Sequence, residues 1–186
     1  SDSDKLFEMI LKESKNITNA DGRTLYTKDK DGNLQFEILR NDTMNTIMGG
    51  TSGVEIPFAP VKLWLDGSTP NQNNVSAYVA LTGNTVNIAD AYEEKGFDFS
   101  GTKSFDQNTG YRSKSFLTVP LKNHENDIIG VIQLINAKNK KGEVVSFDDF
   151  VTHSGVQGAK TKGLCRVEGK QYLMQDGDVV YFRTSA

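Results

Sequence analysis

Cysteine is almost absent from this sequence, because Cys165 is the only one among 186 residues. A single thiol cannot form an internal disulfide or a multi-cysteine metal site, and such scarcity is typical of a reducing cytoplasm. Histidine is also rare: His124 and His153 lie in polar, turn-like contexts without a further metal-ligand pattern. We therefore expect a cytoplasmic protein with solvated histidines, no bound metal and no cofactor.

A strong charge of either sign is absent too, since 21 Lys and Arg oppose 24 Asp and Glu for a net charge of −3. This balance argues against nucleic-acid or membrane-surface partners. The longest apolar runs, such as Ile128 to Leu134, are far shorter than the roughly 20 residues of a membrane-spanning helix. The chain also begins Ser-Asp-Ser-Asp, without an initiator Met or a signal peptide. We expect a soluble fragment excised from a longer protein.

The hydrophobic residues that are present, 37% of the chain, suffice for the core of one generous domain or of one domain with a small appendage. Apolar residues at helical spacing predict an amphipathic helix over Lys5 to Ile17. Alternating runs predict two hairpins, the first from Gly22 to Lys28 and Leu34 to Arg40, the second from Ser113 to Leu121 and Asp127 to Asn136.

Between the hairpins, Asn74 to Leu81 reads as a short helix closed by Gly83, and Thr85 to Ile88 as a short strand. The segments Asn41 to Asn73 and Ala89 to Arg112 are polar and read as long loops. The sequence predicts an α+β domain with an antiparallel sheet of about six strands. We expect the first helix on one face, the two loops on the other, and a small-ligand cavity between loops and sheet.

Three separated motifs resemble GAF domains: the run from Asn74 to Tyr92, the run Phe105 to Ser115 (FDQNTGYRSKS), and Gly130 to Asn136 (GVIQLIN). The resemblance covers about residues 5 to 149. It is greatest to GAF modules of bacterial HD-GYP phosphodiesterases, adenylyl cyclases and sensor kinases, and extends to the cyclic-nucleotide-binding modules of mammalian phosphodiesterases. It implies a GAF fold and a sensor role in signal transduction, with a small-molecule ligand.

The resemblance also implies which residues contact the ligand. Strand, helix-start, lid-loop and central-strand positions of cyclic-nucleotide-binding members fall on Thr24, Leu39, Arg40, Val75, Ser76, Tyr92, Phe97, Thr109, Ser113 and Gln133. The helix start at Val75 and Ser76 would face phosphate, because free N–H groups there favour an anion.

Two departures from the cyclic-nucleotide-binding pattern concern binding and signalling. Leu39 stands where an aromatic residue would stack on the purine, which removes about 1 kcal/mol or more of binding free energy. The family's Lys-to-Asp ion pair is also lost, since Ala137 replaces the Lys and Val151-Thr152 replace Asp-Glu. We therefore expect cyclic GMP and cyclic AMP to bind weakly, and the coupling between pocket and closing helix to be loose.

The C-terminal part contains too many glycines for the long helix that ends a GAF module. Over Glu143 to Arg183 it resembles the C-terminal end of the TGS domain of Obg-like ATPases of the YchF group, with matches such as Gln175-Asp-Gly-Asp178. We expect a GAF domain over residues 1–142, an incomplete TGS-like, partly β-grasp segment over 143–186, and a chimeric join near Gly142 to Phe150. That segment should cover the surface that the missing helix would cover.

No catalytic residues are predicted. The carboxylates Asp90, Glu93, Glu94, Asp98 and Asp106 crowd one loop region and read as a solvated acidic lid rather than an acid/base pair. We expect a non-catalytic regulatory module that binds a small ligand, a cyclic nucleotide or an unknown metabolite, and relays the signal to an output domain elsewhere in the parent protein. Two alternatives stay open: a fragment of an Obg-like nucleotide hydrolase carrying only its TGS end, and a structural module that forms a homodimer through its N-terminal helix.

Overall fold

The computed structural model describes residues 1–151, and the predictions for the segment beyond lie outside the described residues. The chain opens with helix α1 (Asp2–Thr18), capped by the Ser1 hydroxyl, which accepts from the Asp4 amide, and ended by Asn19 in the left-handed conformation. The helix presents Phe7, Ile10 and Leu11 to the sheet. The predicted N-terminal helix is confirmed.

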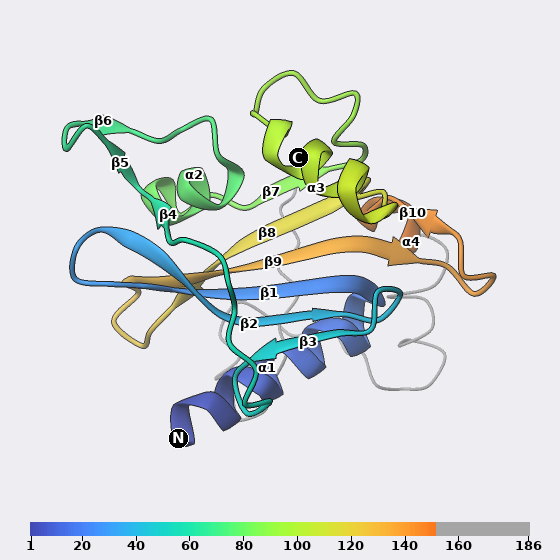
Figure 1. Ribbon diagram of the computed structural model, residues 1–186, viewed down its shortest axis with the longest axis horizontal. Coiled ribbons are helices and arrows are strands. Elements are labelled where there is room, and N and C mark those ends of the chain that lie inside the picture. Colours follow the sequence, from blue (N-terminus) through green and yellow to red (C-terminus); the bar gives the residue numbers. More distant parts are fainter. Residues whose placement is uncertain (152–186) are drawn as a thin grey trace, which may run out of the picture.

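Six strands form the main path of an antiparallel sheet in the order β3-β2-β1-β9-β8-β7 (Figure 1). Their bounds are β1 (Ala20–Lys28), β2 (Asn33–Asn41), β3 (Thr46–Gly49), β7 (Val86–Ile88), β8 (Phe116–Lys122) and β9 (Ile128–Lys138). Two short strands, β4 (Val61–Lys62) beside β2 and β10 (Val144–Val145) beside β9, extend the sheet. The antiparallel α+β fold and both predicted hairpins are confirmed.

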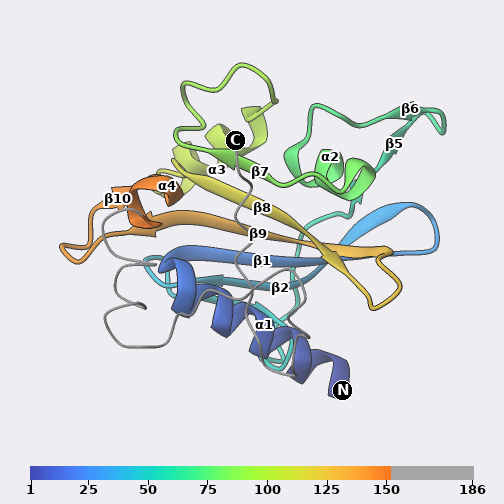
Figure 2. The same cartoon turned by 180° about the vertical axis from the view of Figure 1, so that it is seen from behind.

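The two faces of the sheet bury different helices, as both views show (Figures 1 and 2). On one face, α1 and the short helix α4 (Phe147–Phe150) pack over a core that includes Leu25 of β1 and Ile132 of β9. On the other face, α2 (Val75–Thr82) packs over Tyr26 and Val131. Adjacent strand residues thus divide between two cores, because side chains alternate along a strand.

The local sequence determines where helix α2 begins and ends. The Asn74 side chain caps it by accepting from the Ala77 amide, and Gly83 ends it at φ 72°, where a left-handed residue is needed. The Asn41 to Asn73 excursion before it contains β3, β4 and a small separate hairpin of β5 (Trp64–Leu65) and β6 (Thr69–Pro70).

The segment Ala89 to Arg112 is more ordered than predicted, because it contains helix α3 (Ser100–Thr109). The expectation of a loop there is wrong. Phe105 is the one large apolar residue of the helix and is 38% exposed. The sequence therefore lacks the apolar stripe from which an amphipathic helix is predicted. Within α3 the one buried residue is Asp106, and this carboxylate holds the helix in place instead of an apolar face.

The strands β1 and β9 approach each other unusually closely at Gly130. A Cβ at this position would lie 2.1 Å from the backbone oxygen of Tyr26, so a side chain could enter only if the two strands moved apart. Only glycine permits this approach. The pairing of β1 with β9 at the centre of the sheet therefore depends on it.

Residues 143–151 pack with the rest of the domain. Val145 on β10 pairs with Ala137 on β9, and Phe147 and Phe150 belong to the same core as α1. The predicted division of the chain at residues 142 and 143 stays a prediction.

Candidate functional site

One row of side chains crosses all six strands of the main sheet on the face covered by α2. The cross-strand pairs are Met48–Leu39, Leu39–Thr24, Thr24–Gln133, Gln133–Thr118 and Thr118–Val86. Directly opposite residues share a face of the sheet. The row therefore brings together three predicted ligand-contacting residues, Leu39, Thr24 and Gln133, with polar groups at its centre. We call it the central row.

The start of α2 lies over the middle of the central row. Gln133 Nε2 donates to Ser76 Oγ and to Thr118 Oγ1, both at 3.2 Å. Ser76 also hydrogen-bonds the Tyr26 hydroxyl, while burial raises the pKa of Tyr26 to about 12. Ser76 and Val75 are buried in the first turn of α2, so the structure places both on the sheet side of this helix.

Aromatic residues close the apolar side of this region. Phe97 packs edge-on against Tyr78 of α2, with ring centroids 5.3 Å apart, and also against the core that contains Val75. In the same core, the Phe99 ring packs tilted by 51° against Phe116 of β8, with ring centroids 5.1 Å apart. The segment before α3 thus covers the β8 end of the face.

Tyr92 and Ser113, two further predicted contacts, both meet Asp106. The Tyr92 hydroxyl donates to Asp106 Oδ2 at 2.6 Å, and the Ser113 hydroxyl donates to Asp106 Oδ1 at 2.8 Å. The Ser113 amide adds a third bond to Oδ2 at 2.8 Å. The Arg112 guanidinium lies 3.9 Å from the centroid of the Tyr92 ring and covers it. The bond to Asp106 and burial raise the pKa of Tyr92.

Asp106 contradicts the expectation of a solvated acidic lid. Its side chain accepts three hydrogen bonds and the residue is only 4% exposed, whereas Glu93 and Asp98 are exposed. Sequence reasoning grouped all the carboxylates of this segment together. The available signal was the position of Asp106 seven residues before Ser113, in a motif rich in hydroxyl donors.

The structure does not bring Arg40 and Thr109 to this group. Arg40 is adjacent to Leu39 and points to the opposite face, where its guanidinium pairs with Glu8 of α1 and donates to the carbonyl of Met48 at 2.5 Å. Thr109 is exposed at the end of α3, and its hydroxyl donates to the Phe105 carbonyl at 2.8 Å. Because successive side chains of a strand point to opposite faces of the sheet, the sequence could have shown that Leu39 and Arg40 lie on different faces.

A second polar cluster, which sequence reasoning missed, joins the start of β1 to the end of β9. Asp21 is 3% exposed and accepts from the Tyr111 hydroxyl at 2.7 Å, from Lys138 Nζ at 3.1 Å and from the Thr43 amide at 3.2 Å. Burial raises the pKa of Asp21, but these hydrogen bonds outweigh it and hold that pKa below its usual range. Burial and the bond to Asp21 in turn raise the pKa of Tyr111.

Asn136 completes this cluster, and both the nitrogen and the oxygen of its side-chain amide form hydrogen bonds. Its Nδ2 donates to Tyr111 Oη at 3.0 Å and to the Arg112 carbonyl at 2.8 Å, and its Oδ1 accepts from the amides of Lys114 and Ser115. Lys138, which pairs with Asp21, lies one position beyond Ala137. We call Asp21, Tyr111, Asn136 and Lys138 the Asp21 cluster.

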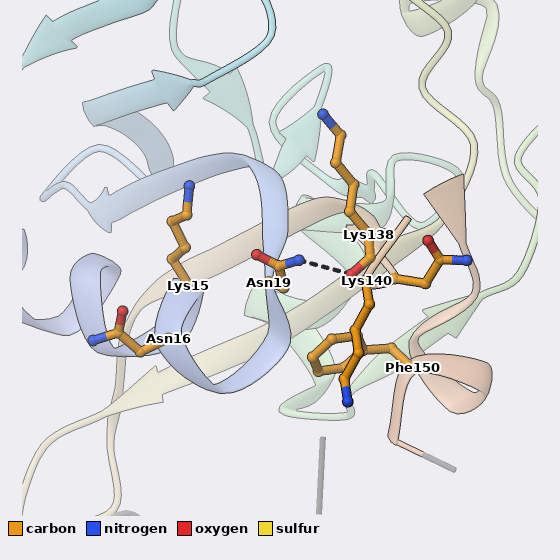
Figure 3. Close-up of a pocket in the computed structure, with 7 residues that line it drawn as sticks. Lys15, Asn16, Asn19, Lys138, Lys140 and Phe150 are labelled. Carbon is orange, nitrogen blue, oxygen red and sulfur yellow. Dashed lines mark hydrogen bonds between the residues drawn. The ribbon is translucent and has the colours of Figure 1, made fainter. Parts of the chain in front are cut away.

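A hollow of about 310 Å³ opens away from the central row, between the end of α1, the β9–β10 connection and α4 (Figure 3). Lys15, Asn16, Lys138 and Lys140 line it beside Phe150, and Asn19 Nδ2 donates to the Lys138 carbonyl at 2.7 Å. A second hollow, of about 580 Å³, lies beside α1 over Arg23 and Arg40.

Within residues 1–151, no set of three or more His, Cys, Asp or Glu side chains is arranged to hold a metal ion. The same part of the chain contains no helix with the length and apolar character needed to span a membrane.

Two family patterns match this sequence. The GAF domain family matches residues 2–152. The YchF-GTPase_C family, described as a protein of unknown function, matches residues 135–185. The two matches share residues 135–152, which begin in β9 and end one residue past the described part of the chain.

Relatives of both kinds occur among characterised proteins. The chain is 42% identical over 80 residues to dual 3′,5′-cyclic-AMP and -GMP phosphodiesterase 11A of Takifugu rubripes, a match that covers 43% of this chain and 8% of the relative. It is 51% identical over 43 residues to the ribosome-binding ATPase YchF of Pasteurella multocida, covering 23% and 12%. The matches thus span only about a tenth of each of these relatives.

Among solved structures, the NreA protein of Staphylococcus aureus, mutated in its nitrate-binding site, superposes with a TM-score of 0.48 at 13% identity. The superposition covers 80% of this chain and 98% of that protein.

Proposed function

Because this chain belongs to the GAF domain family, we propose that it is a non-catalytic regulatory module that binds a small ligand against the central row, beneath α2 and the segment before α3. The observation that carries the proposal is the row itself. Thr24, Gln133 and Thr118 place neutral polar groups side by side, and Leu39 and Met48 continue the surface as an apolar strip. Such a mixture suits a small molecule that is partly polar and partly apolar.

The start of α2 supports an anionic group on the ligand. The Ala77 amide donates to the Asn74 side chain, whereas the Val75 and Ser76 amides donate to no partner among residues 1–151. Free amides at a helix start bind anions such as phosphate. The similarity to a cyclic-nucleotide phosphodiesterase makes cyclic nucleotides the first class to test. Leu39 lacks the flat ring that would stack on a purine, so affinities in the micromolar range or weaker are expected.

Calorimetric titration of the full chain with cyclic GMP and cyclic AMP tests this proposal, with amide chemical shifts used to locate the bound nucleotide. Gln133→Leu should abolish or strongly weaken binding, because it removes the polar centre of the row. Gln35→Leu is the matched control, since Gln35 lies in the same sheet but outside the row and bonds to Asp29. Binding that persists unchanged in Gln133→Leu, or shifts confined to the α1 face, would place the ligand elsewhere.

A sub-micromolar affinity for either nucleotide would show that tight binding does not need a stacking ring at residue 39. If neither nucleotide binds, the same shift assay with a panel of small metabolites identifies the ligand class. Incubation with ATP or GTP separates this proposal from a nucleotide hydrolase, because sustained hydrolysis contradicts a regulatory role without catalysis.

A structural dimerisation role is the second candidate, and one observation favours it. Leu6 and Met9 on the outer side of α1 are 49% and 56% exposed. Sedimentation of the full chain and of Met9→Glu distinguishes the two roles. Dimerisation that is lost in Met9→Glu, together with no ligand binding, would favour the structural role.

A further inference from the structure

In the segment between β7 and β8, residues 89–115, the two ends meet through a backbone hydrogen bond from the Ala91 amide to the Lys114 carbonyl at 2.8 Å and through the Asp106 carboxylate of α3. Helix α3 has no buried apolar side chain of its own, and its one buried residue is Asp106. The Asp106 carboxylate accepts from Tyr92, near the start of the segment, and from Ser113, near its end. This carboxylate therefore attaches α3 to both ends of the segment.

This segment also bounds the proposed ligand site. Phe97 and Phe99, which precede α3, pack on Tyr78 of α2 and Phe116 of β8. Phe116 pairs with Ile135 one row beyond the central row, so the segment covers the adjacent part of the same face. A helix with few apolar contacts and one polar attachment opens locally at a lower free energy than the sheet beneath it.

We propose that Asp106 is the positioning residue of a lid formed by residues 89–115, and that its bonds to Tyr92 and Ser113 control how fast ligand enters and leaves the central row. The proposal rests on the proposed function for its ligand, but the attachment itself exists without one. The Tyr92 and Ser113 hydroxyls both donate their hydrogen bonds to Asp106, which leaves only their oxygen lone pairs for a ligand. A ligand that meets these two hydroxyls in the closed lid must therefore offer them hydrogen-bond donors.

Hydrogen exchange of the full chain without ligand tests the attachment. In Asp106→Asn the α3 amides, including that of Gly110, which bonds to the Asp106 carbonyl, should exchange at least about tenfold faster, because a charge-assisted bond is lost from the closed state. Amides of β1 and β9 should keep their protection. Glu93→Gln is the matched control, because it removes one charge from an exposed residue of the same segment.

Tyr92→Phe and Ser113→Ala each remove one of the hydroxyl bonds to Asp106. They test the attachment even if Asp106→Asn fails to fold. Both should give intermediate exchange rates, and Tyr92→Phe should add little in the Asp106→Asn background. The Tyr92 ring carbon resonance should titrate at lower pH in Asp106→Asn than in the unchanged protein. Unchanged α3 exchange in Asp106→Asn, or an equal acceleration in α3, β1 and β9, would overturn the proposal.

The kinetic part uses cyclic GMP as the probe in stopped-flow binding. The dissociation rate should rise about tenfold in Asp106→Asn and stay unchanged in Glu93→Gln. An unchanged dissociation rate with faster α3 exchange would show that the lid opens without controlling the ligand. Absence of cyclic GMP binding in the unchanged protein would count against the nucleotide as ligand, while the exchange experiment still decides the role of Asp106.

Discussion

Replacing Asp21 by Asn perturbs the Asp21 cluster with almost no change of shape. The carboxylate accepts three hydrogen bonds, from Tyr111, Lys138 and the Thr43 amide. An asparagine supplies one acceptor oxygen and an NH₂ group, which would face a donor in at least one of these positions. Lys138 would also lose its charge partner.

The expected loss of unfolding free energy depends on how deeply Asp21 and Lys138 are buried. Asp21 is buried, but the Lys138 side chain is 29% exposed. Breaking a fully buried ion pair costs about 3–5 kcal/mol, whereas exposed pairs contribute about 0–1 kcal/mol. We expect Asp21→Asn to lower the free energy of unfolding by about 2–3 kcal/mol at pH 7, as measured by urea denaturation of the full chain.

The same substitution predicts a pH dependence. The pKa of Asp21 is lowered in the folded protein, so its stabilising effect is present above the ordinary Asp pKa of about 3.9 and is lost as the pH falls through the folded-state pKa. The difference between the unchanged protein and Asp21→Asn should therefore narrow below about pH 4. Asp31→Asn, in the exposed β1–β2 turn, should change stability by less than about 0.5 kcal/mol. A cost at pH 7 no larger than that of this control, or a difference that stays constant into acid, would refute the reasoning.

Three further predictions concern the sheet and its proposed ligand-binding face. Burial raises the pKa of Tyr26 to about 12, so the neutral phenol stabilises the folded state fully below about pH 10, and this stabilisation is lost toward pH 12. Between pH 8 and 11, the free energy of unfolding should therefore fall less steeply with pH for Tyr26→Phe than for the unchanged protein. Gly130→Ala should lower the free energy of unfolding by at least about 2–3 kcal/mol, because its Cβ would meet the Tyr26 carbonyl, whereas Gly101→Ala, in the open first turn of α3, should be neutral or slightly stabilising; thermal melts of both variants test this. Leu39→Phe should tighten cyclic GMP binding about fivefold by calorimetry, since it restores a ring for stacking worth about 1 kcal/mol; an unchanged affinity would mean that the base does not lie over residue 39.

The elements that could be predicted from sequence are those with complete local signals. Helix α2 has its cap at Asn74 and its stop at Gly83, and the hairpin β1–β2 has alternating strands around a turn. Helix α3 has no such signal, because its apolar residues form no stripe and its one buried contact is made by a carboxylate. A side chain whose partners lie 7 and 14 residues away cannot be distinguished locally from a solvated one.

Part of the arrangement of the candidate site could be predicted from sequence, while the role of its residues stays a prediction. The structure places Thr24, Leu39 and Gln133 in one row, with Ser76 above it. Arg40 could have been set apart from sequence alone, since a neighbour in a strand faces the other way. The Asp21 cluster could not, because Asp21 and Lys138 are far apart in sequence and meet only through the pairing of β1 with β9.

The alternation at Leu39 and Arg40 means that a single peptide unit separates the proposed ligand surface from α1. Leu39 lies in the central row, while Arg40 pairs with Glu8 of the helix on the far side of the sheet. Glu8 in turn accepts from the Thr51 amide just beyond β3, which is the strand that carries Met48. A ligand that displaces Leu39 and β2 would therefore also displace α1, through the peptide unit between Leu39 and Arg40 and the ion pair between Arg40 and Glu8. This route does not involve the hydrophobic core.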